Sequence, residues 1–190
     1  MTKTMTTMRT GTTSNPDPAN GKKSALLWLV IPLSAVALAA AVNFLLIVNA
    51  VVPSASMEPT VPEGALVVGS RLAYLNRSPK AGDIIIFTHK EFPGKLLIKR
   101  VAATEGQRFA VTDGAVYIDG KPMGDAPGDD FPEVIVPAGM LVVLGDNRAH
   151  SKDSRYWDDP FVRVSDVRAR AEFMYYPRFA ALTGSVPAAQ

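Results

Sequence analysis

The residues best suited to chemistry begin with two serines between two prolines, in the segment Pro53-Ser54-Ala55-Ser56-Met57-Glu58-Pro59. Proline restricts the backbone, and most residues between the two prolines are small, so this segment is stiff. A stiff segment fixes a hydroxyl against an approaching carbonyl group, as a serine nucleophile requires. Taken by itself, the segment is equally a turn with solvated hydroxyls. It indicates catalysis only if a base lies nearby.

A candidate base is Lys99, which interrupts the apolar run Leu96-Leu97-Ile98-Lys99-Arg100-Val101-Ala102. This run is typical of a buried strand, and alternation places Lys99 on one face with Leu97 and Val101. Loss of hydration on an apolar face lowers the pKa of a lysine and leaves a neutral amine that can take a proton. Arg100 stays protonated and cannot serve as a base. The alternative is a lysine that keeps an edge strand soluble.

A third candidate segment is the dense polar loop at residues 145–155, which follows the apolar strand at residues 140–144. Asp153 and Arg155 are expected to form an ion pair that holds the loop rigid. Ser151 is expected to hydrogen-bond a neighbouring amine. These residue types support a reacting group rather than react themselves, so the loop is interpreted as support for the site.

The elements that position these residues are predicted to be short strands. Apolar runs rich in Val, Ile and Leu recur after residue 53, separated by Pro-Glu-Gly, Pro-Gly, Asp-Gly and Pro-Ala-Gly turns. A further strand is expected over residues 43–52. No helical period intervenes, which favours a mainly β fold with an antiparallel sheet. The runs are ALVVGSRLAYL, DIIIFTH, KLLIKRVAA, AVYIDG, PEVIVP, MLVVLGD and ARAEFMYYP.

The N-terminal part predicts a membrane segment. An uncharged run of about 19 residues begins at Ser24, close to the length that spans a bilayer as a helix. Basic residues lie only before it, which predicts a cytoplasmic N-terminus and an exported domain. The predicted boundaries are a disordered tail at 1–23, a transmembrane helix at 24–43, a β peptidase domain at 44–180 and a tail at 181–190. A cleavable signal peptide ending near Ala39-Ala40-Ala41 is the alternative, and it also exports the domain.

Composition excludes several other classes. The net charge of +2 is small and both signs are mixed through the second half, so a nucleic-acid surface is not expected. The absence of cysteine rules out disulfides, thiolate metal sites and a cysteine nucleophile. The two histidines, His89 and His150, have no partner at metal-ligand spacing and are interpreted as loop or surface residues.

In combination, these segments resemble the bacterial type I signal peptidases, membrane-bound serine peptidases that release exported proteins from their signal peptides. The resemblance covers residues 24–178. It rests on Pro-Ser-x-Ser-Met-x-Pro-Thr at 53–60, Gly-Asp and an apolar strand at 82–87, Lys-Arg-Val at 99–101, and Gly-Asp-Asn-Arg-x-x-Ser-x-Asp-Ser-Arg at 145–155. The order of these motifs makes the combination specific.

The resemblance implies a role for each matching residue. Ser56 is the nucleophile and Lys99 its general base, Ser54 and the Ser56 backbone N–H form the oxyanion hole, and Ser151 orients the lysine. The residues implied as loop support are Asp146, Asn147, Arg148, Asp153 and Arg155, and those implied as substrate contacts are Val52, Pro53, Met57 and Ile98. No cofactor and no metal are implied.

The resemblance also implies the substrates and the setting. The substrates are exported preproteins, held extended near Val52 and Ile98 and cut after small-x-small sites. The setting is the bacterial plasma (inner) membrane, crossed once, with the N-terminus cytoplasmic and the catalytic domain in contact with the bilayer outside.

One departure and several alternatives accompany the resemblance. After Lys-Arg-Val the family has Pro-Gly-Asp where this chain has Glu105-Gly106-Gln107, which affects that turn but not Ser56 or Lys99. One rival is a specialised processing peptidase of the same type, acting on conjugation or secretion components. Another is the self-cleaving repressor class, which needs a DNA-reading helical domain where residues 1–52 offer a membrane span. The third is a catalytically inactive, membrane-tethered binding domain.

Overall fold

The computed structural model describes the backbone of residues 18–182 and the side chains of residues 28–182. Within that part, one α-helix precedes a series of short antiparallel strands. The chain divides between Ala41 and Val42 into a helical unit and a β unit. The predicted fold class, mainly antiparallel β with one N-terminal apolar helix, is therefore confirmed.

The helix α1 (Pro18–Leu46) is longer at both ends than the predicted span of 24–43. Proline suits the first helical position, where no backbone N–H is needed, so the helix begins six residues early, inside the predicted tail. It continues through Phe44-Leu45-Leu46 and ends where the β-branched residues Ile47 and Val48 favour a strand. The predicted tail at residues 1–17 lies outside the described residues.

The segment Trp28–Leu46 of α1 comprises 19 residues with a mean hydropathy of 2.3, long and apolar enough to cross a membrane. Pro32 lies inside this helix, which continues on both sides of it. The local loss of one backbone hydrogen bond is tolerated in such helices because neighbouring groups compensate for it.

The β unit contains two sheets. The strands in chain order are β1 (Ile47–Val51), β2 (Leu66–Ser70), β3 (Ile84–Phe87), β4 (Leu97–Thr104), β5 (Arg108–Thr112), β6 (Ala115–Ile118), β7 (Lys121–Asp125), β8 (Phe131–Ile135), β9 (Met140–Leu144), β10 (Val162–Arg163), β11 (Val167–Tyr176) and β12 (Ala180–Ala181). The 3-10 turns are η1 (Ala55–Met57), η2 (Leu72–Tyr74), η3 (Arg148–His150) and η4 (Val164–Asp166).

The larger sheet has the strand order β1-β2-β11-β3-β4-β9-β10, with β12 paired to β11, and its strand pairs are antiparallel. This order brings β4, with Lys99, beside β9, whose end opens the polar loop. Residues far apart in the sequence are therefore neighbours across one sheet. The larger sheet is the element that positions the predicted site.

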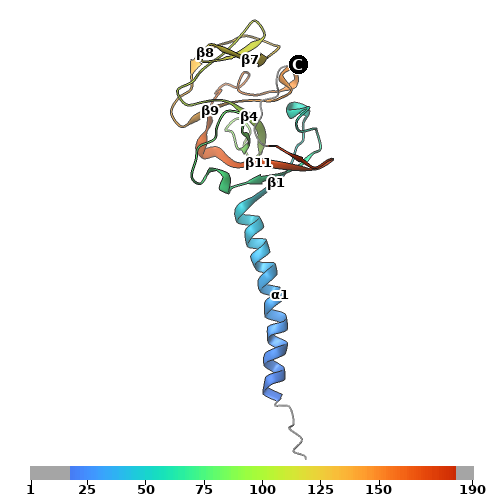
Figure 1. The fold of residues 1–190 in the computed structure, drawn as a ribbon. Helices are drawn as coiled ribbons and strands as arrows, with labels where there is room; N and C mark the ends of the chain where they lie inside the picture. The colour runs from blue at the N-terminus through green and yellow to red at the C-terminus, as the bar shows by residue number, and fades with distance from the viewer. Residues whose placement is uncertain (1–17, 183–190) are drawn as a thin grey trace, which may run out of the picture. The chain divides into compact units, whose positions relative to one another are not determined.

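The smaller sheet has the order β7-β6-β5-β8. Its hairpins turn at Asp113-Gly114 and Asp119-Gly120, where all four residues have positive φ, as the predicted Asp-Gly turns require. In Figure 1, β7 and β8 lie at one end of the β unit and β1 at the other. The inner face of this sheet packs Phe109 and Val111 against Val142 and Leu144 of β9.

The predicted apolar runs each contain a strand, but two strands of the smaller sheet, β5 and β7, were not predicted. β7 contains Pro122 and Gly124, which are unfavourable in strands and tolerated here because β7 is an edge strand. The predicted strand at residues 43–52 is shorter, since its first four residues belong to α1. The separate second sheet follows from tertiary packing rather than from any local pattern.

Two smaller predictions are also corrected. The predicted C-terminal tail begins too early, because Ala181 belongs to β12 and Leu182 is buried, donating its N–H to the Glu172 carbonyl. Residues 183–190 of that tail lie outside the described residues. His89 lies in a loop, as one of the two predicted alternatives, but it is buried rather than at the surface: its ring stacks on Trp157 with the centroids 4.4 Å apart.

Candidate active site

Ser56 lies in the 3-10 turn η1, directly after β1. Val52 and Met57 on either side are fully buried in the apolar core, so they anchor the turn at both ends. Backbone bonds hold it further: Val52 exchanges bonds with Gly64 and Ala65, and Val61 donates to the Met57 carbonyl. The Ser56 side chain is itself buried. The stiffness predicted for this segment thus comes from packing as well as from its prolines.

Lys99 on β4 meets this serine. Its Nζ lies 2.5 Å from Ser56 Oγ, and the lysine is only 6% exposed. Lys99 pairs with Ile85 on the neighbouring strand β3. Along β4 it shares a face with Leu97 and Val101, and these apolar residues pack in one cluster with Ile85. The predicted apolar face is therefore present, and it brings together a hydroxyl and an amine that are 43 residues apart.

Burial lowers the pKa of Lys99 from 10.5 to about 8. The buried carboxylates Asp153 and Asp146 oppose this effect and keep the pKa from falling further. At pH 7 about one tenth of the amine is therefore neutral. The neutral form of the amine therefore becomes the main form as the pH rises through about 8.

Ser54 and Ser151 both lie at the site, but they differ in exposure and in hydrogen bonding. Ser54 is exposed, and its hydroxyl donates to Ser56 Oγ at 3.2 Å. Ser151 is buried, but its Oγ has no hydrogen-bond partner among the described residues. The predicted bond from Ser151 to Lys99 is thus not formed in this structure. Ser151 lies instead against Gly145, where a Cβ would collide with Ser151 Oγ and the Ser56 carbonyl oxygen.

The loop at 145–155 is held rigid by buried ion pairs. Asp153 and Arg155, predicted to pair, are 2.9 Å apart between Oδ1 and Nε, with both side chains fully buried. The other oxygen of Asp153 accepts the Gly145 N–H at 2.9 Å. Arg155 also donates to the Arg148 carbonyl, which ties the two halves of the loop together. The loop is therefore a fixed wall of the site.

A second buried ion pair was not predicted. Arg100 donates two hydrogen bonds to Asp146, at 2.7 and 2.6 Å, and a third to the Gly82 carbonyl at 2.8 Å. The sequence signal was an arginine inside an apolar strand and an aspartate directly after another strand. Because β4 and β9 are neighbours, these two positions meet.

Asn147 is the other contact that sequence reasoning did not identify. It was predicted only as loop support, yet its backbone and side chain both donate to the turn that carries Ser56. No local pattern could indicate this, since the partners are 92 positions apart for the side-chain bond.

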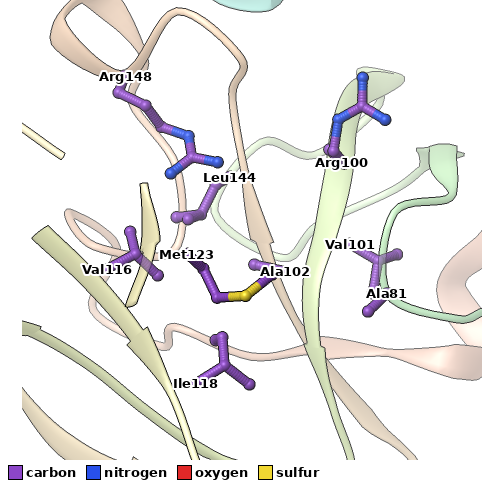
Figure 2. Close-up of a pocket in the computed structure, with 9 residues that line it drawn as sticks. All are labelled: Ala81, Arg100, Val101, Ala102, Val116, Ile118, Met123, Leu144 and Arg148. Carbon is purple, nitrogen blue, oxygen red and sulfur yellow. The ribbon is translucent and has the colours of Figure 1, made fainter. Parts of the chain in front are cut away.

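One cavity lies apart from Ser56 and Lys99. Figure 2 shows an apolar pocket between the sheets, lined by Ala102, Val116, Ile118 and Leu144, with the guanidinium of Arg148 extending over it. Neither Ser56 nor Lys99 lines it. Over the described residues, no group of three or more His, Cys, Asp or Glu is arranged to hold a metal ion.

The cavity beside Ser56, of about 70 Å³, is lined by residues 50–54, by residues 96–99 and by Ile86. Among the described residues, β1 pairs with β2 on one side alone, and β4 pairs with β9 only from Arg100 onward. Two open strand edges thus border the cavity. Of the predicted substrate contacts, Val52, Pro53 and Ile98 line it, whereas the fully buried Met57 does not.

Comparison with known proteins gives the same class of enzyme. The family model described as "Signal peptidase, peptidase S26" matches residues 25–176. The chain is 36% identical over 161 residues to "Probable signal peptidase I-1" of Synechocystis sp., covering 77% of this chain and 81% of that protein. It is 30% identical to "Signal peptidase I" of Bacillus caldolyticus, covering 75% and 87%.

Two further matches are more limited. "Thylakoidal processing peptidase 1, chloroplastic" of Arabidopsis thaliana is 31% identical, with 66% of this chain and 41% of that protein covered. A crystal structure of a signal peptidase I from Enterococcus faecalis is 28% identical and matches 50% of this chain and 97% of that chain, with a TM-score of 0.43.

These matches, together with an apolar helix that precedes the mainly β unit in the chain, indicate a membrane-anchored serine endopeptidase. The chain belongs to the signal peptidase family, peptidase S26. The resemblance inferred from the sequence motifs is confirmed. The activity is accordingly the cleavage of signal peptides from exported preproteins.

Proposed function

We propose that Ser56 is the nucleophile and Lys99 the general base of this signal peptidase. The observation that carries the proposal is the 2.5 Å separation between Lys99 Nζ and Ser56 Oγ. Both side chains are buried, and burial brings the pKa of Lys99 to about 8, so a neutral amine is accessible near physiological pH. The S26 family model covers both positions.

The reaction then proceeds in two halves. Neutral Nζ of Lys99 takes the proton from Ser56 as Oγ attacks the scissile carbonyl carbon. The Lys99 ammonium returns that proton to the leaving amine, which departs as the new N-terminus, and an ester links the signal peptide to Ser56. Neutral Lys99 next takes a proton from water, the hydroxide attacks the ester carbonyl, and the proton returns to Ser56 Oγ.

The oxyanion formed in each half needs donors. We assign this role to the Ser54 hydroxyl and the Ser56 backbone N–H, each contributing about 3 kcal/mol to lowering the barrier. The 3.2 Å contact between the two serine hydroxyls supports the assignment, because a rotation of the exposed Ser54 side chain redirects its O–H. Ser151, buried beside Gly145 and without a partner among the described residues, is assigned to orient the Lys99 ammonium.

The substrate is proposed to lie extended in the cavity beside Ser56, as a strand between the open edges of β1 and β4. Backbone pairing supplies affinity in this arrangement, and pocket size supplies selectivity. A cavity of about 70 Å³ lined by Val52, Ile86 and Ile98 suits small apolar side chains. This supports cleavage after small-x-small sites.

The cellular setting is part of the proposal: one crossing of the bacterial plasma membrane, with the N-terminus in the cytoplasm. Lys22 and Lys23 lie directly before the apolar stretch. Basic residues beside a membrane helix favour the cytoplasmic side. Exposed Phe173 and Phe179 contact each other at 5.7 Å between ring centroids, and exposed Tyr176 lies near them on β11. Aromatic side chains are favoured at bilayer interfaces, so this surface is proposed to rest on lipid.

The test compares the full-length protein with Ser56→Ala in lipid vesicles, using several unrelated exported precursors. We expect Ser56→Ala to lose cleavage by at least about 10³-fold while its unfolding temperature is unchanged. Ser78→Ala, which alters an exposed serine, is the control and should cleave normally. Full cleavage by Ser56→Ala would remove the assignment.

The same panel of precursors separates the general enzyme from a specialised processing peptidase. Cleavage of most precursors supports the general activity. Cleavage of one or two, with the others intact under identical conditions, supports the specialised alternative.

A further inference from the structure

Asn147 makes two hydrogen bonds to the turn that carries Ser56. Its backbone N–H donates to the Ser56 carbonyl at 3.1 Å, and its side-chain Nδ2 donates to the Ala55 carbonyl at 3.1 Å. Asn147 follows Gly145 and Asp146 at the end of β9. It therefore joins the polar loop directly to the backbone on the N-terminal side of the nucleophile and to the nucleophile itself.

The orientation of the Asn147 amide is determined by its neighbours. The Ala55 carbonyl oxygen can only accept, so the amide atom facing it is the nitrogen. The amide oxygen lies 3.1 Å from His150 Nδ1, and the His150 N–H donates to the Asn147 carbonyl at 3.0 Å. The side chain is thus held from both ends.

The side-chain bond acts on the peptide unit that contains the Ser56 N–H. The Ala55 carbonyl and the Ser56 N–H belong to one trans peptide plane and point in opposite directions. A donor that fixes the carbonyl therefore also fixes the direction of the N–H. Hydrogen bonding at the oxygen polarises the unit and makes the N–H a stronger donor. Glu58 N–H donates to the same oxygen at 3.1 Å, which adds to this effect.

We propose that Asn147 is a positioning residue for the oxyanion hole: its amide fixes and polarises the Ala55–Ser56 peptide so that the Ser56 N–H is aimed at the developing oxyanion. This inference rests on the proposed roles of Ser56 and Lys99. Asn147 does not line the cavity beside Ser56, and its bonds to the turn go to backbone carbonyls rather than to Ser56 Oγ. Its contribution appears in the transition state, where the oxyanion exists, and not in substrate binding.

The test uses Asn147→Asp and Asn147→Ala in the full-length protein. Asn147→Asp keeps the size of the side chain and the backbone N–H, but removes the donor to Ala55. We expect kcat to fall about tenfold in both variants, less than the loss of an oxyanion donor itself, with KM within about twofold. Lys152→Ala, at an exposed position of the same loop, is the matched control and should leave kcat unchanged.

A second readout separates positioning from general support of the fold. A peptide boronic acid bonds to Ser56 Oγ and places a negatively charged tetrahedral group in the oxyanion hole. The cleaved signal peptide, as its carboxylate product, binds the same cavity without that group. We expect both variants to weaken the boronate about tenfold and the product less than twofold.

Three results would decide the matter. An unchanged kcat in Asn147→Asp overturns the inference, as does equal weakening of the boronate and the product. A shift in the pH midpoint of kcat in Asn147→Ala, which adds no charge, also overturns it, because the residue would then act through Lys99. If Ser56→Ala is inactive while Asn147→Asp is normal, this inference fails and the proposed function stands.

Discussion

Lys99 and Arg100 are adjacent cations on β4, both buried, at 6% and 3% exposure, and their surroundings differ completely. Arg100 is neutralised by two hydrogen bonds to Asp146 and a third to a backbone carbonyl. Lys99 bonds to a neutral hydroxyl and has no carboxylate within ion-pair distance in the described part of the chain. One strand thus carries a permanently charged structural residue and an amine that can lose its proton.

The difference shows how one fold separates stability from catalysis. A buried charge is tolerated when a carboxylate and a carbonyl satisfy it, as at Arg100. A buried amine given no direct counter-charge becomes neutral more easily, as at Lys99, since desolvation disfavours the ammonium. Alternation along the strand places the two environments on opposite faces.

The largest expected effect is on cleavage, and it comes from giving position 99 a permanent charge like that of Arg100. In Lys99→Arg the amine is replaced by a guanidinium, which does not lose its proton, so no base remains. Precursor cleavage should fall by about 10³-fold or more at every pH between 6 and 10. Appreciable cleavage by this variant, measured with the purified full-length protein, would contradict the base assignment.

The second expected effect is on the free energy of unfolding. Its sign should be opposite for substitutions at Arg100 and at Lys99, which lie on opposite faces of β4. Arg100→Met leaves Asp146 buried without a partner, which should lower the free energy of unfolding by about 3 kcal/mol. Lys99→Met removes a desolvated amine and should raise it at pH 7 by roughly 2 kcal/mol. Chemical denaturation of both variants measures the difference. Equal destabilisation by the two substitutions would contradict the proposed difference between the surroundings of Arg100 and Lys99.

The pH dependence is the third expected effect. The pKa of Lys99 is lowered to about 8. In the proposed mechanism the neutral amine is the active form. Cleavage should therefore increase as the pH rises through about 8 and level off above it. The stability cost of burying this lysine is fully present below pH 8 and disappears by about pH 10.5, where the unfolded chain also loses the proton. A rate that is flat between pH 5 and pH 9 would contradict a lysine base.

The smallest expected effect is on the pH dependence of cleavage, and it involves Asp146, which interacts with both Arg100 and Lys99. Asp146 pairs with Arg100 and also raises the pKa of Lys99 through space. Asp146→Asn retains one acceptor for Arg100 and removes the charge, so the pKa of Lys99 should fall. The midpoint of the pH–rate profile should move down by less than about one pH unit, with activity retained. A midpoint that moves upward would show that the field at Lys99 has another source.

The sequence was sufficient where chemistry is local or periodic. Alternation around Lys99 predicted its apolar face, the uncharged stretch after residue 23 predicted the helix, and Asp-Gly pairs predicted the hairpin turns. Local patterns did not predict β7, which contains proline and glycine and is a strand only because β6 offers it a pairing edge. They also placed the ends of α1 wrongly, because the residues beyond each predicted end are compatible with a helix.

The residue types of the site, and the family they indicate, were determined by the sequence alone, since Ser56, Lys99 and the 145–155 loop are each a short continuous motif. Only the tertiary structure decided how these segments meet: which carboxylate neutralises Arg100, which groups hold the turn at Ala55, and that Ser151 is not bonded to Lys99. The bonds from Arg100 to Asp146 and from Asn147 to Ala55 join positions 46 and 92 residues apart. Their energies depend on burial, which no single segment contains.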